Sequence, residues 1–211
     1  MAASGRAEQS STYGLILAGG LARRMGGGDK TLLRIGHKTI LERAIATLAP
    51  QCAGLMINAN GDLSRFARFG LPVVSDEIAG FAGPLAGILA GLDWLAVNEP
   101  EKIWMVSVPG DCPFLPGDLV ARLHEQRIAS GLPLACAQSG EWRHPVVGLW
   151  PVSLRHDLRK ALQAGSRKIE AWTTKHGVAL AQWPAEPIDP FFNVNTPEDA
   201  ATAERIAMRV V

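Results

Sequence analysis

A stretch near the start of the chain, LILAGGLARRMGGGDKTLL (residues 15–33), combines five glycines with three cationic side chains. Gly19 and Gly20 directly follow an apolar run, and they would let backbone N–H groups approach a ligand where a side chain would collide. Arg24 adds a planar, forked cation, and Lys30 adds a point charge. Together these groups could hold two or three phosphates and stabilise charge on a leaving pyrophosphate. The alternative is a glycine-rich connection whose cations face solvent.

Two familiar phosphate-binding motifs do not fit this loop. Counted from Gly19, the dinucleotide fingerprint G-x-G-x-x-G would need glycines where the chain has Leu21 and Arg24. The P-loop motif G-x-x-x-x-G-K-[ST] could end at Lys30 and Thr31, but it would need glycines where the chain has Arg24 and Asp29. The loop is therefore a longer phosphate-binding candidate with a different charge pattern.

The elements that must position this loop alternate between strand-like and helix-like patterns along the chain. Alternation at these lengths predicts a three-layer, Rossmann-like α/β fold with a mainly parallel sheet and helices on both faces. In such folds ligands gather at the carboxyl ends of the strands. Strands are expected at 13–19, 54–60, 71–76, 102–111, 132–138, 144–150 and 178–184, and helices at 38–50, 62–70, 83–97, 118–128, 153–165, 166–177 and 196–211. The segment 144–150 could pair antiparallel with a neighbour.

Length and composition favour one globular domain. The chain has 211 residues, of which 47% are hydrophobic and 19% charged, so it can bury a sizeable core. We expect a single domain over residues 13–211, preceded by a mobile tail over residues 1–12. A net charge of +1 offers no general field for a nucleic acid or an anionic membrane, so an anion site must be local.

Cysteine usage and hydropathy favour a cytoplasmic protein. Cys52, Cys112 and Cys136 lie far apart and form no CxxC pair, which indicates neither a disulfide framework nor a zinc site. Residues 1–12 lack the apolar core of a signal peptide. Apolar runs fall short of the ~18 residues that a membrane span requires.

Three polar residues lie at or near the ends of expected strands and should meet at one edge of the sheet. Asp111 ends the most hydrophobic strand, and its carboxylate is the hard oxygen ligand that Mg²⁺ prefers beside phosphates. Asp76 ends another strand, and Asn58 lies near the end of a third; an amide can bind a base or ribose edge, and a carboxylate can accept the paired N–H donors of guanine. Helix or turn capping is the alternative role for each of the three.

Two further segments carry candidate ligand groups. Asn193 and Asn195 alternate along FNVNTPED, so their side chains share one face and could bind a polar ligand or complete a metal site. The segment GPLAGI, which begins at Gly83, has small residues against which a flat base could lie. Its alternative role is tight packing between helix and sheet.

The glycine-rich loop resembles the signature of nucleotidyltransferases that activate small phosphorylated molecules, and it is most similar to the molybdenum cofactor guanylyltransferase branch. The resemblance continues, in order and spacing, through INAN, VVSDEIAGFAGPLAGILAGL, VPGDCPFLP, RHPVVGLW and FFNVNTPEDA. It covers roughly residues 13–205. LAGG together with GPLAG resembles the guanine-selecting branch, whereas the cytidylyltransferases of the same cofactor more closely resemble LAAG at the first position.

The resemblance implies a fold of the nucleotide-diphospho-sugar transferase type and a defined reaction. GMP would pass from GTP to the terminal phosphate of the molybdenum-molybdopterin cofactor, with release of pyrophosphate. It implies catalytic roles for Arg24, Lys30 and Asp111, with Mg²⁺ held by Asp111. Nucleotide-binding roles are implied for Leu17, Ala18, Gly19, Gly20, Lys30, Asn58, Asp76, Gly83 and Asp111.

The family's second substrate is a pterin with a terminal phosphate, and polar residues in the second half of the chain could bind it. Asn193, Asn195, Arg143, His144 and Arg167 are the candidates for binding it. His144 could equally be a structural hydrogen-bonding residue, and Trp142 or Trp172 could line a pterin pocket.

Other functions remain open from the sequence. They include a cytidylyltransferase of the same cofactor, a sugar-phosphate nucleotidyltransferase, and a carrier that stores the cofactor without catalysis. The resemblance also implies contacts with proteins that supply the cofactor or receive it.

Overall fold

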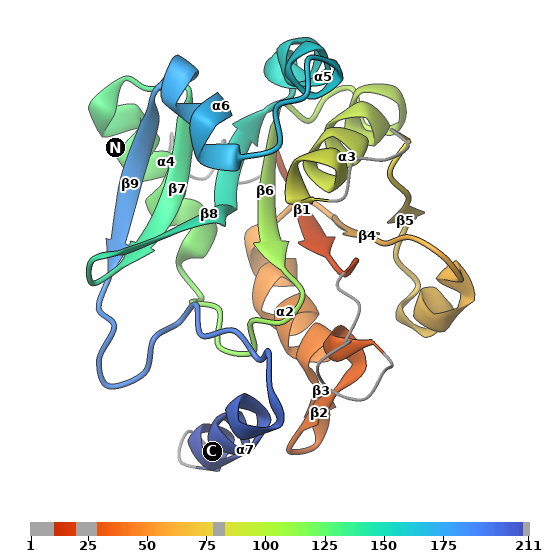
Figure 1. Ribbon diagram of the computed structural model, residues 1–211, viewed down its shortest axis with the longest axis vertical. Coiled ribbons are helices and arrows are strands. Elements are labelled where there is room, and N and C mark those ends of the chain that lie inside the picture. The colour runs from red at the N-terminus through yellow and green to blue at the C-terminus, as the bar shows by residue number, and fades with distance from the viewer. Residues whose placement is uncertain (1–10, 20–28, 78–82, 209–211) are drawn as a thin grey trace.

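The computed structural model describes residues 11–19, 29–77 and 83–208, which form a three-layer α/β fold (Figure 1). A seven-stranded sheet occupies the centre in the order β5-β4-β1-β6-β8-β7-β9. Its strands are β1 (Thr12–Leu17), β4 (Leu55–Asn58), β5 (Val73–Val74), β6 (Trp104–Pro109), β7 (Leu134–Ser139), β8 (Trp142–Pro151) and β9 (Val178–Trp183).

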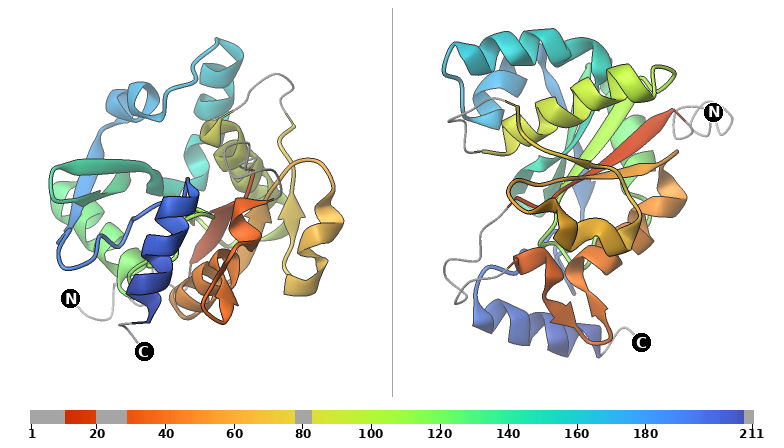
Figure 2. Two further views of the ribbon diagram at one scale, coloured as in Figure 1. Left: turned by 60° about the horizontal axis from the view of Figure 1, so that its bottom comes forward. Right: turned by 90° about the vertical axis from the view of Figure 1, so that its right-hand side faces the viewer.

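Helices cover both faces of the sheet (Figure 2). Buried apolar side chains place α2 (Ile40–Leu48) and α4 (Leu119–Ser130) on one face. A second apolar cluster places α3 (Pro84–Asn98), α5 (Arg155–Gln163) and α6 (Ile169–His176) on the other face. The 3-10 helices are η2 (Lys30–Leu32), η3 (Ala49–Gln51), η4 (Leu63–Phe69) and η5 (Val152–Leu154).

The sheet is mainly parallel, which confirms the predicted fold class. Strands β5, β4, β1 and β6 pair in parallel, as do β7 and β9, whereas β8 lies antiparallel to both β6 and β7. The pairing of β8 with β7 shifts register between Cys136 and Ala137. Pro145 lies in the part of β8 opposite this shift and lacks a backbone donor. The neighbouring Val146 carbonyl instead accepts from Ser107 Oγ on β6 over 2.6 Å.

A third, smaller apolar cluster joins the last helix to a hairpin that the sequence patterns did not predict. The hairpin consists of β2 (Arg34–Ile35) and β3 (Lys38–Thr39), and the helix is α7 (Pro197–Ala207). Ile35 and Ile40 pack against Val194 and α7. This contact brings the end of the described chain beside the segment that carries Lys30.

The helix ends and the start of the first strand differ from the expected ranges only in detail. Thr39 and Thr196 cap α2 and α7 through capping boxes, which add stability at each helix start. The helix expected over 62–70 is the 3-10 helix η4, with Asp62 as its N-cap and Gly70 at a left-handed C-cap. Strand β1 begins at Thr12, the last residue assigned to the expected tail; residues 1–10 lie outside the described part. Within the described residues, no helix is long and apolar enough to cross a membrane.

Candidate active site

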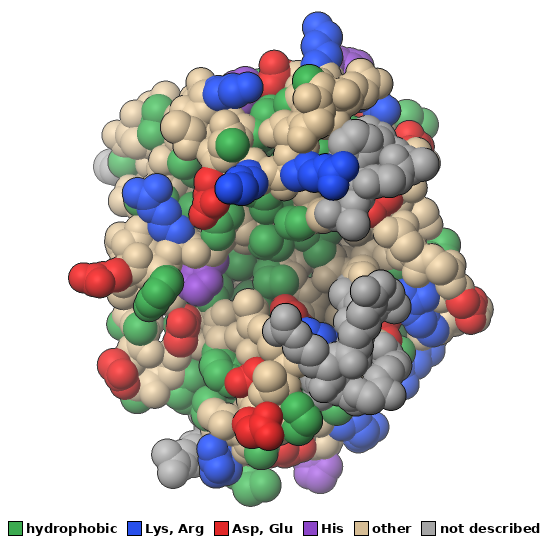
Figure 3. All heavy atoms as spheres, in the orientation of Figure 1, with side chains coloured by type: hydrophobic (Ala, Val, Ile, Leu, Met, Phe, Trp, Pro, Cys, Tyr) green, Lys and Arg blue, Asp and Glu red, His purple; other side chains and the backbone are tan. Residues whose placement is uncertain are grey.

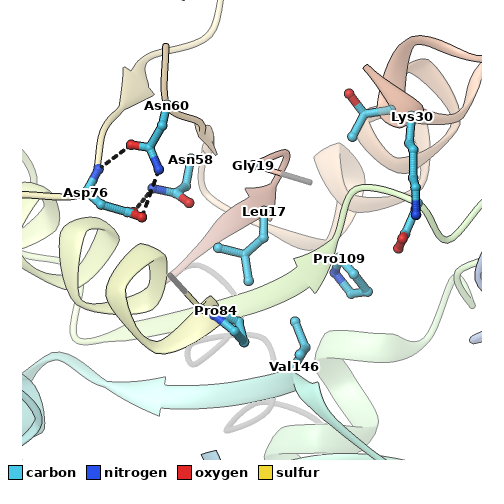
Figure 4. Close-up of a pocket in the computed structure, with 12 residues that line it drawn as sticks. Leu17, Gly19, Lys30, Asn58, Asn60, Asp76, Pro84, Pro109 and Val146 are labelled. Atoms are coloured by element: carbon cyan, nitrogen blue, oxygen red, sulfur yellow. Dashed lines mark hydrogen bonds between the residues drawn. The ribbon is translucent and has the colours of Figure 1, made fainter. Parts of the chain in front are cut away.

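A pocket of about 400 Å³ opens at the carboxyl ends of β1, β4 and β6, where the topology predicted a ligand site (Figure 4). Polar side chains lie at its two ends, and apolar side chains form much of the wall between them. The lining residues are Leu17, Gly19, Lys30, Thr31, Asn58, Asn60, Asp76, Gly83, Pro84, Pro109, Asp111 and Val146. Seven of these were predicted from the sequence: Leu17, Gly19, Lys30, Asn58, Asp76, Gly83 and Asp111.

One end of the pocket is a hydrogen-bonded group of two amides and a carboxylate (Figure 4). Asn58 Nδ2 donates to Asp76 Oδ1 over 2.9 Å and to the carbonyl of Val74 over 3.2 Å. Asn60 Nδ2 donates to Asp76 Oδ2 over 2.9 Å, and the Asp76 amide donates back to Asn60 Oδ1 over 3.0 Å. Each carboxylate oxygen thus accepts one amide donor and retains a lone pair for a further donor. The two amide side chains hold Asp76 in one orientation.

The other end of the pocket carries Lys30, at the first turn of η2. Asp29 is the N-cap of this helix: its Oδ1 accepts from the Thr31 amide over 3.0 Å and from Thr31 Oγ1 over 2.7 Å. Lys30 Nζ donates to Asn195 Oδ1 over 2.9 Å, so the residue that precedes the N-cap of α7 orients the cation. Asn195, which was predicted to bind the second substrate, is therefore a direct hydrogen-bond partner of Lys30.

Asp111 follows β6 and lines the same end of the pocket as Lys30. Burial raises the pKa of Asp111, and the nearby Lys30 charge partly opposes this effect by lowering it. The backbone carbonyl of Asp111 accepts from the Val194 amide over 3.0 Å, which fixes the turn that carries the carboxylate.

The donor set at Asp111 suits a hard divalent cation. Mg²⁺ is usually held by one or two carboxylates together with substrate phosphates and water. Within the described residues, no group of three His, Cys, Asp or Glu side chains could hold a metal by itself. A half-buried carboxylate that lines the pocket could therefore hold such a cation if a bound ligand supplied further oxygen atoms.

The backbone between the two ends is held by close contacts of the strands. The Ala18 amide donates to the Asn58 carbonyl over 2.8 Å, and the Gly110 amide donates to the Leu17 carbonyl over 2.9 Å. A Cβ at Gly110 would lie 2.7 Å from Thr31 Cγ2, so this position needs glycine. Ala18 itself is buried, whereas a Cβ at Gly19 would meet no atom of the described residues within 4 Å, its chain neighbours aside.

The GPLAGI segment forms both a pocket wall and a packing contact. Gly83 precedes α3 and lines the pocket. Gly87, one turn into α3, packs directly on β4: a Cβ there would clash with the Asn58 side chain and lie 2.7 Å from Leu17 Cδ2. Tight helix–sheet packing is therefore the role of Gly87, and it sets the position of Asn58.

The remaining candidates in the second half lie outside the lining of this pocket. Arg143 and Arg167 are exposed on the surface. His144 is half-buried; its Nε2 lies 2.7 Å from Ser139 Oγ, and burial lowers its pKa. Asn193 Oδ1 accepts from Cys112 Sγ over 2.7 Å, beside the Asp111 turn.

The tryptophans differ sharply in position. Trp172 is buried in the core against Trp150, so the prediction that it could line a pterin pocket was wrong. Trp142, at the start of β8, has a side chain that is largely exposed.

Figure 3 shows a hollow near the carboxyl end of β6 whose visible walls are mostly hydrophobic side chains.

Two of the predicted site residues, Gly20 and Arg24, lie outside the described residues. Five lining residues were not predicted: Thr31, Asn60, Pro84, Pro109 and Val146. Asn60 could have been found, since it lies two residues after Asn58 in INAN. Val146 gives no such signal because it reaches the pocket through the antiparallel pairing of β8 with β6.

Comparisons with known proteins show the family to which this chain belongs. Residues 14–180 match the MobA-like NTP transferase domain family. A molybdenum cofactor guanylyltransferase from Nitrobacter hamburgensis is 59% identical over 93% of this chain and 94% of its own length. One from Rhodopseudomonas palustris (strain BisB5) is 55% identical over 96% of this chain and 97% of its own.

A solved structure shares the fold. Molybdopterin-guanine dinucleotide biosynthesis protein A from Archaeoglobus fulgidus superposes with a TM-score of 0.73 at 21% identity, covering 93% of this chain and 99% of its own. The family match and the curated relatives define the protein as a nucleotidyltransferase with a MobA-like domain. The chain belongs to the molybdenum cofactor guanylyltransferases.

Proposed function

We propose that the protein transfers GMP from GTP to the terminal phosphate of molybdenum-molybdopterin, giving the guanine dinucleotide form of the cofactor and pyrophosphate. The observation that carries this proposal is a single pocket with a fixed carboxylate at one end and Lys30 with Asp111 at the other. The names of the relatives support the pairing of a guanine nucleotide with the molybdenum cofactor.

The base is proposed to lie at the Asp76 end. Guanine presents N1–H and N2–H₂ as neighbouring donors, which a carboxylate can accept together. Cytosine presents the N3 acceptor beside its amino group, and that lone pair would face the carboxylate charge. Because Asn58 and Asn60 hold the Asp76 carboxylate from both sides, it cannot easily turn away from the wrong base.

The triphosphate is proposed to lie toward Lys30 and Gly19. In the reaction an oxygen of the acceptor phosphate forms a bond to the α-phosphorus, and the bond from that phosphorus to the oxygen bridging to the β-phosphorus breaks. The electron pair leaves with pyrophosphate, whose charge Lys30 stabilises. No general base is required, because the attacking phosphate is already an anion at neutral pH.

Asp111 would hold Mg²⁺ at this end of the pocket, together with phosphate oxygens. When bound, the metal would supply charge neutralisation at the phosphates. Catalysis would then consist mainly of alignment and electrostatic stabilisation. Arg24 is proposed to add a second cation, as the resemblance of the loop implies.

Pyrophosphate release tests the proposal. The purified protein is given Mg²⁺, molybdenum-loaded molybdopterin and either GTP or CTP, and the dinucleotide product is identified by mass. We expect release with GTP and little with CTP. Release with CTP alone would overturn the base assignment, and GTP binding without pyrophosphate release would indicate a carrier or a different acceptor.

A further inference from the structure

Arg65, on η4, contacts segments from both ends of the pocket without lining it. Its Nε lies 2.9 Å from Asp29 Oδ2, and its Nη2 donates to the backbone carbonyl of Asn60 over 3.1 Å. Its Nη1 donates to the carbonyl of Asp62. A guanidinium can make these contacts at once because its donors lie in one rigid plane.

The contact with Asp29 acts on the segment that carries Lys30. Asp29 uses Oδ1 to cap η2 through Thr31 and uses Oδ2 for Arg65. Both carboxylate oxygens are thus occupied, and the first turn of η2 is anchored to η4.

The contact of Arg65 with Asn60 acts on the Asp76 end of the pocket. The Asn60 side chain exchanges two hydrogen bonds with Asp76, while its carbonyl is held by Arg65. One side chain therefore connects the start of the Lys30 helix with the residue that orients Asp76.

Arg65 also neutralises the charge of the Asp29 carboxylate. The Asp29 side chain is 10% exposed and that of Arg65 is 27% exposed, so solvent screens the pair incompletely. Without Arg65, an uncompensated carboxylate would remain next to Lys30, where a triphosphate is proposed to bind. That carboxylate would repel the phosphates and attract the Lys30 ammonium away from them.

We infer that Arg65 is a positioning residue for the nucleotide, which sets the spacing between the base end and the phosphate end and neutralises Asp29. The inference rests on the proposed binding of a nucleoside triphosphate in this pocket. It extends the site to a residue that touches no substrate.

The test compares Arg65→Gln with a matched control on the same helix. Arg68 also stacks on a phenylalanine (4.7 Å to the Phe69 ring, against 4.5 Å from Arg65 to the Phe66 ring). Its carboxylate partner, Glu42, lies at 3.9 Å on the surface, away from the pocket lining. Arg68→Gln therefore removes the same type of charge from η4 without touching the site.

Nucleotide affinity, turnover and thermal unfolding are measured for each variant with Mg·GTP. For Arg65→Gln we expect KM and Kd for GTP to rise about tenfold, the scale of one charge-assisted contact, while kcat changes less than about threefold. Arg65→Lys should recover part of the affinity, since it restores the charge but not the fork. Adding Asp29→Asn to Arg65→Gln should also recover part of it, because the unpaired carboxylate is removed.

The outcomes separate this inference from the proposed function. Wild-type protein that does not bind Mg·GTP would overturn the proposed function and the inference with it. Wild-type binding, with equal KM and unfolding midpoint for Arg65→Gln and Arg68→Gln, would overturn only the inference. A loss of affinity in Arg65→Gln that neither Arg65→Lys nor Asp29→Asn reduces would also overturn it.

Discussion

Lys30 Nζ donates a 2.9 Å hydrogen bond to Asn195 Oδ1, a residue 165 positions away in the chain. The backbone amide of Asn195 in turn donates to Asp199 Oδ2, which belongs to the capping box of α7. The position of the pocket cation thus depends on a helix at the far end of the sequence. The packing of Ile35 against Val194 and α7 holds the two segments together.

Asn195→Ala should therefore reduce turnover through Lys30. We expect a loss of about tenfold, because a hydrogen bond to a charged group contributes about 1.5–3 kcal/mol and about 1.4 kcal/mol corresponds to tenfold. Steady-state pyrophosphate release at saturating GTP measures it. Thr202→Ala is the control, because the half-buried Thr202 bonds within α7 through the Glu198 carbonyl and makes no contact with Lys30; equal activity of the two variants would contradict the role of Asn195.

Lys30→Ala should have a larger effect than Asn195→Ala, because it removes the charge itself. By analogy with the loss of other electrostatic donors, turnover should fall by roughly 10²–10³. The rate of pyrophosphate release at saturating GTP is the measurement. A fall of less than about threefold would mean that Lys30 does not stabilise the leaving group.

Asp111→Asn should abolish most activity or shift its dependence on Mg²⁺ to much higher concentration, because an amide is a weaker ligand than a carboxylate. The check is a titration of activity against Mg²⁺ at fixed GTP. Wild-type activity of the variant at limiting Mg²⁺ would remove Asp111 from the proposed metal site.

The same substitution should stabilise the protein in the absence of metal and nucleotide. Burial raises the folded-state pKa of Asp111, so ionising this carboxyl costs stability as the pH rises through that pKa. Relative to wild type, the unfolding free energy of Asp111→Asn should therefore increase from acid to neutral pH and then level off. Denaturant unfolding in EDTA at several pH values measures this difference, and a constant difference across them would contradict it.

Gly87→Ala should weaken GTP binding although Gly87 lies outside the pocket lining. The added Cβ would lie 2.8 Å from Asn58 Cγ, so Asn58 and its bond to Asp76 must shift. We expect KM for GTP to rise by about tenfold, the scale of a lost charge-assisted hydrogen bond.

Gly91→Ala is the matched control for Gly87→Ala on the same helix. Its Cβ would lie 2.8 Å from Met105 Sδ in the core, so it should cost stability without changing KM. If both variants lose stability alike and bind GTP alike, the Gly87 contact does not set the position of Asn58.

The sequence pattern was sufficient for most elements and for seven of the twelve pocket-lining residues. Apolar runs closed by Gly, Asn or Asp mark where β1, β4 and β6 end, and parallel strands place those ends at one edge. Asn58, Asp76 and Asp111 lie at or just after the ends of β4, β5 and β6, so they were predictable as parts of one site. Lys30 was predicted from the charge of the glycine-rich loop that follows β1. The hairpin of β2 and β3 was not predicted, because each strand is two residues long and shows no periodicity.

The family, the strand–helix order and the type of chemistry follow from residue types and local spacing, which encode them directly. Three relationships appear only in the folded protein: Asn195 holds Lys30, Arg65 joins Asp29 to Asn60, and Val146 forms a pocket wall. Each of these relationships depends on contacts between segments far apart in the chain. Such contacts follow from how the layers pack, and local sequence patterns do not record them.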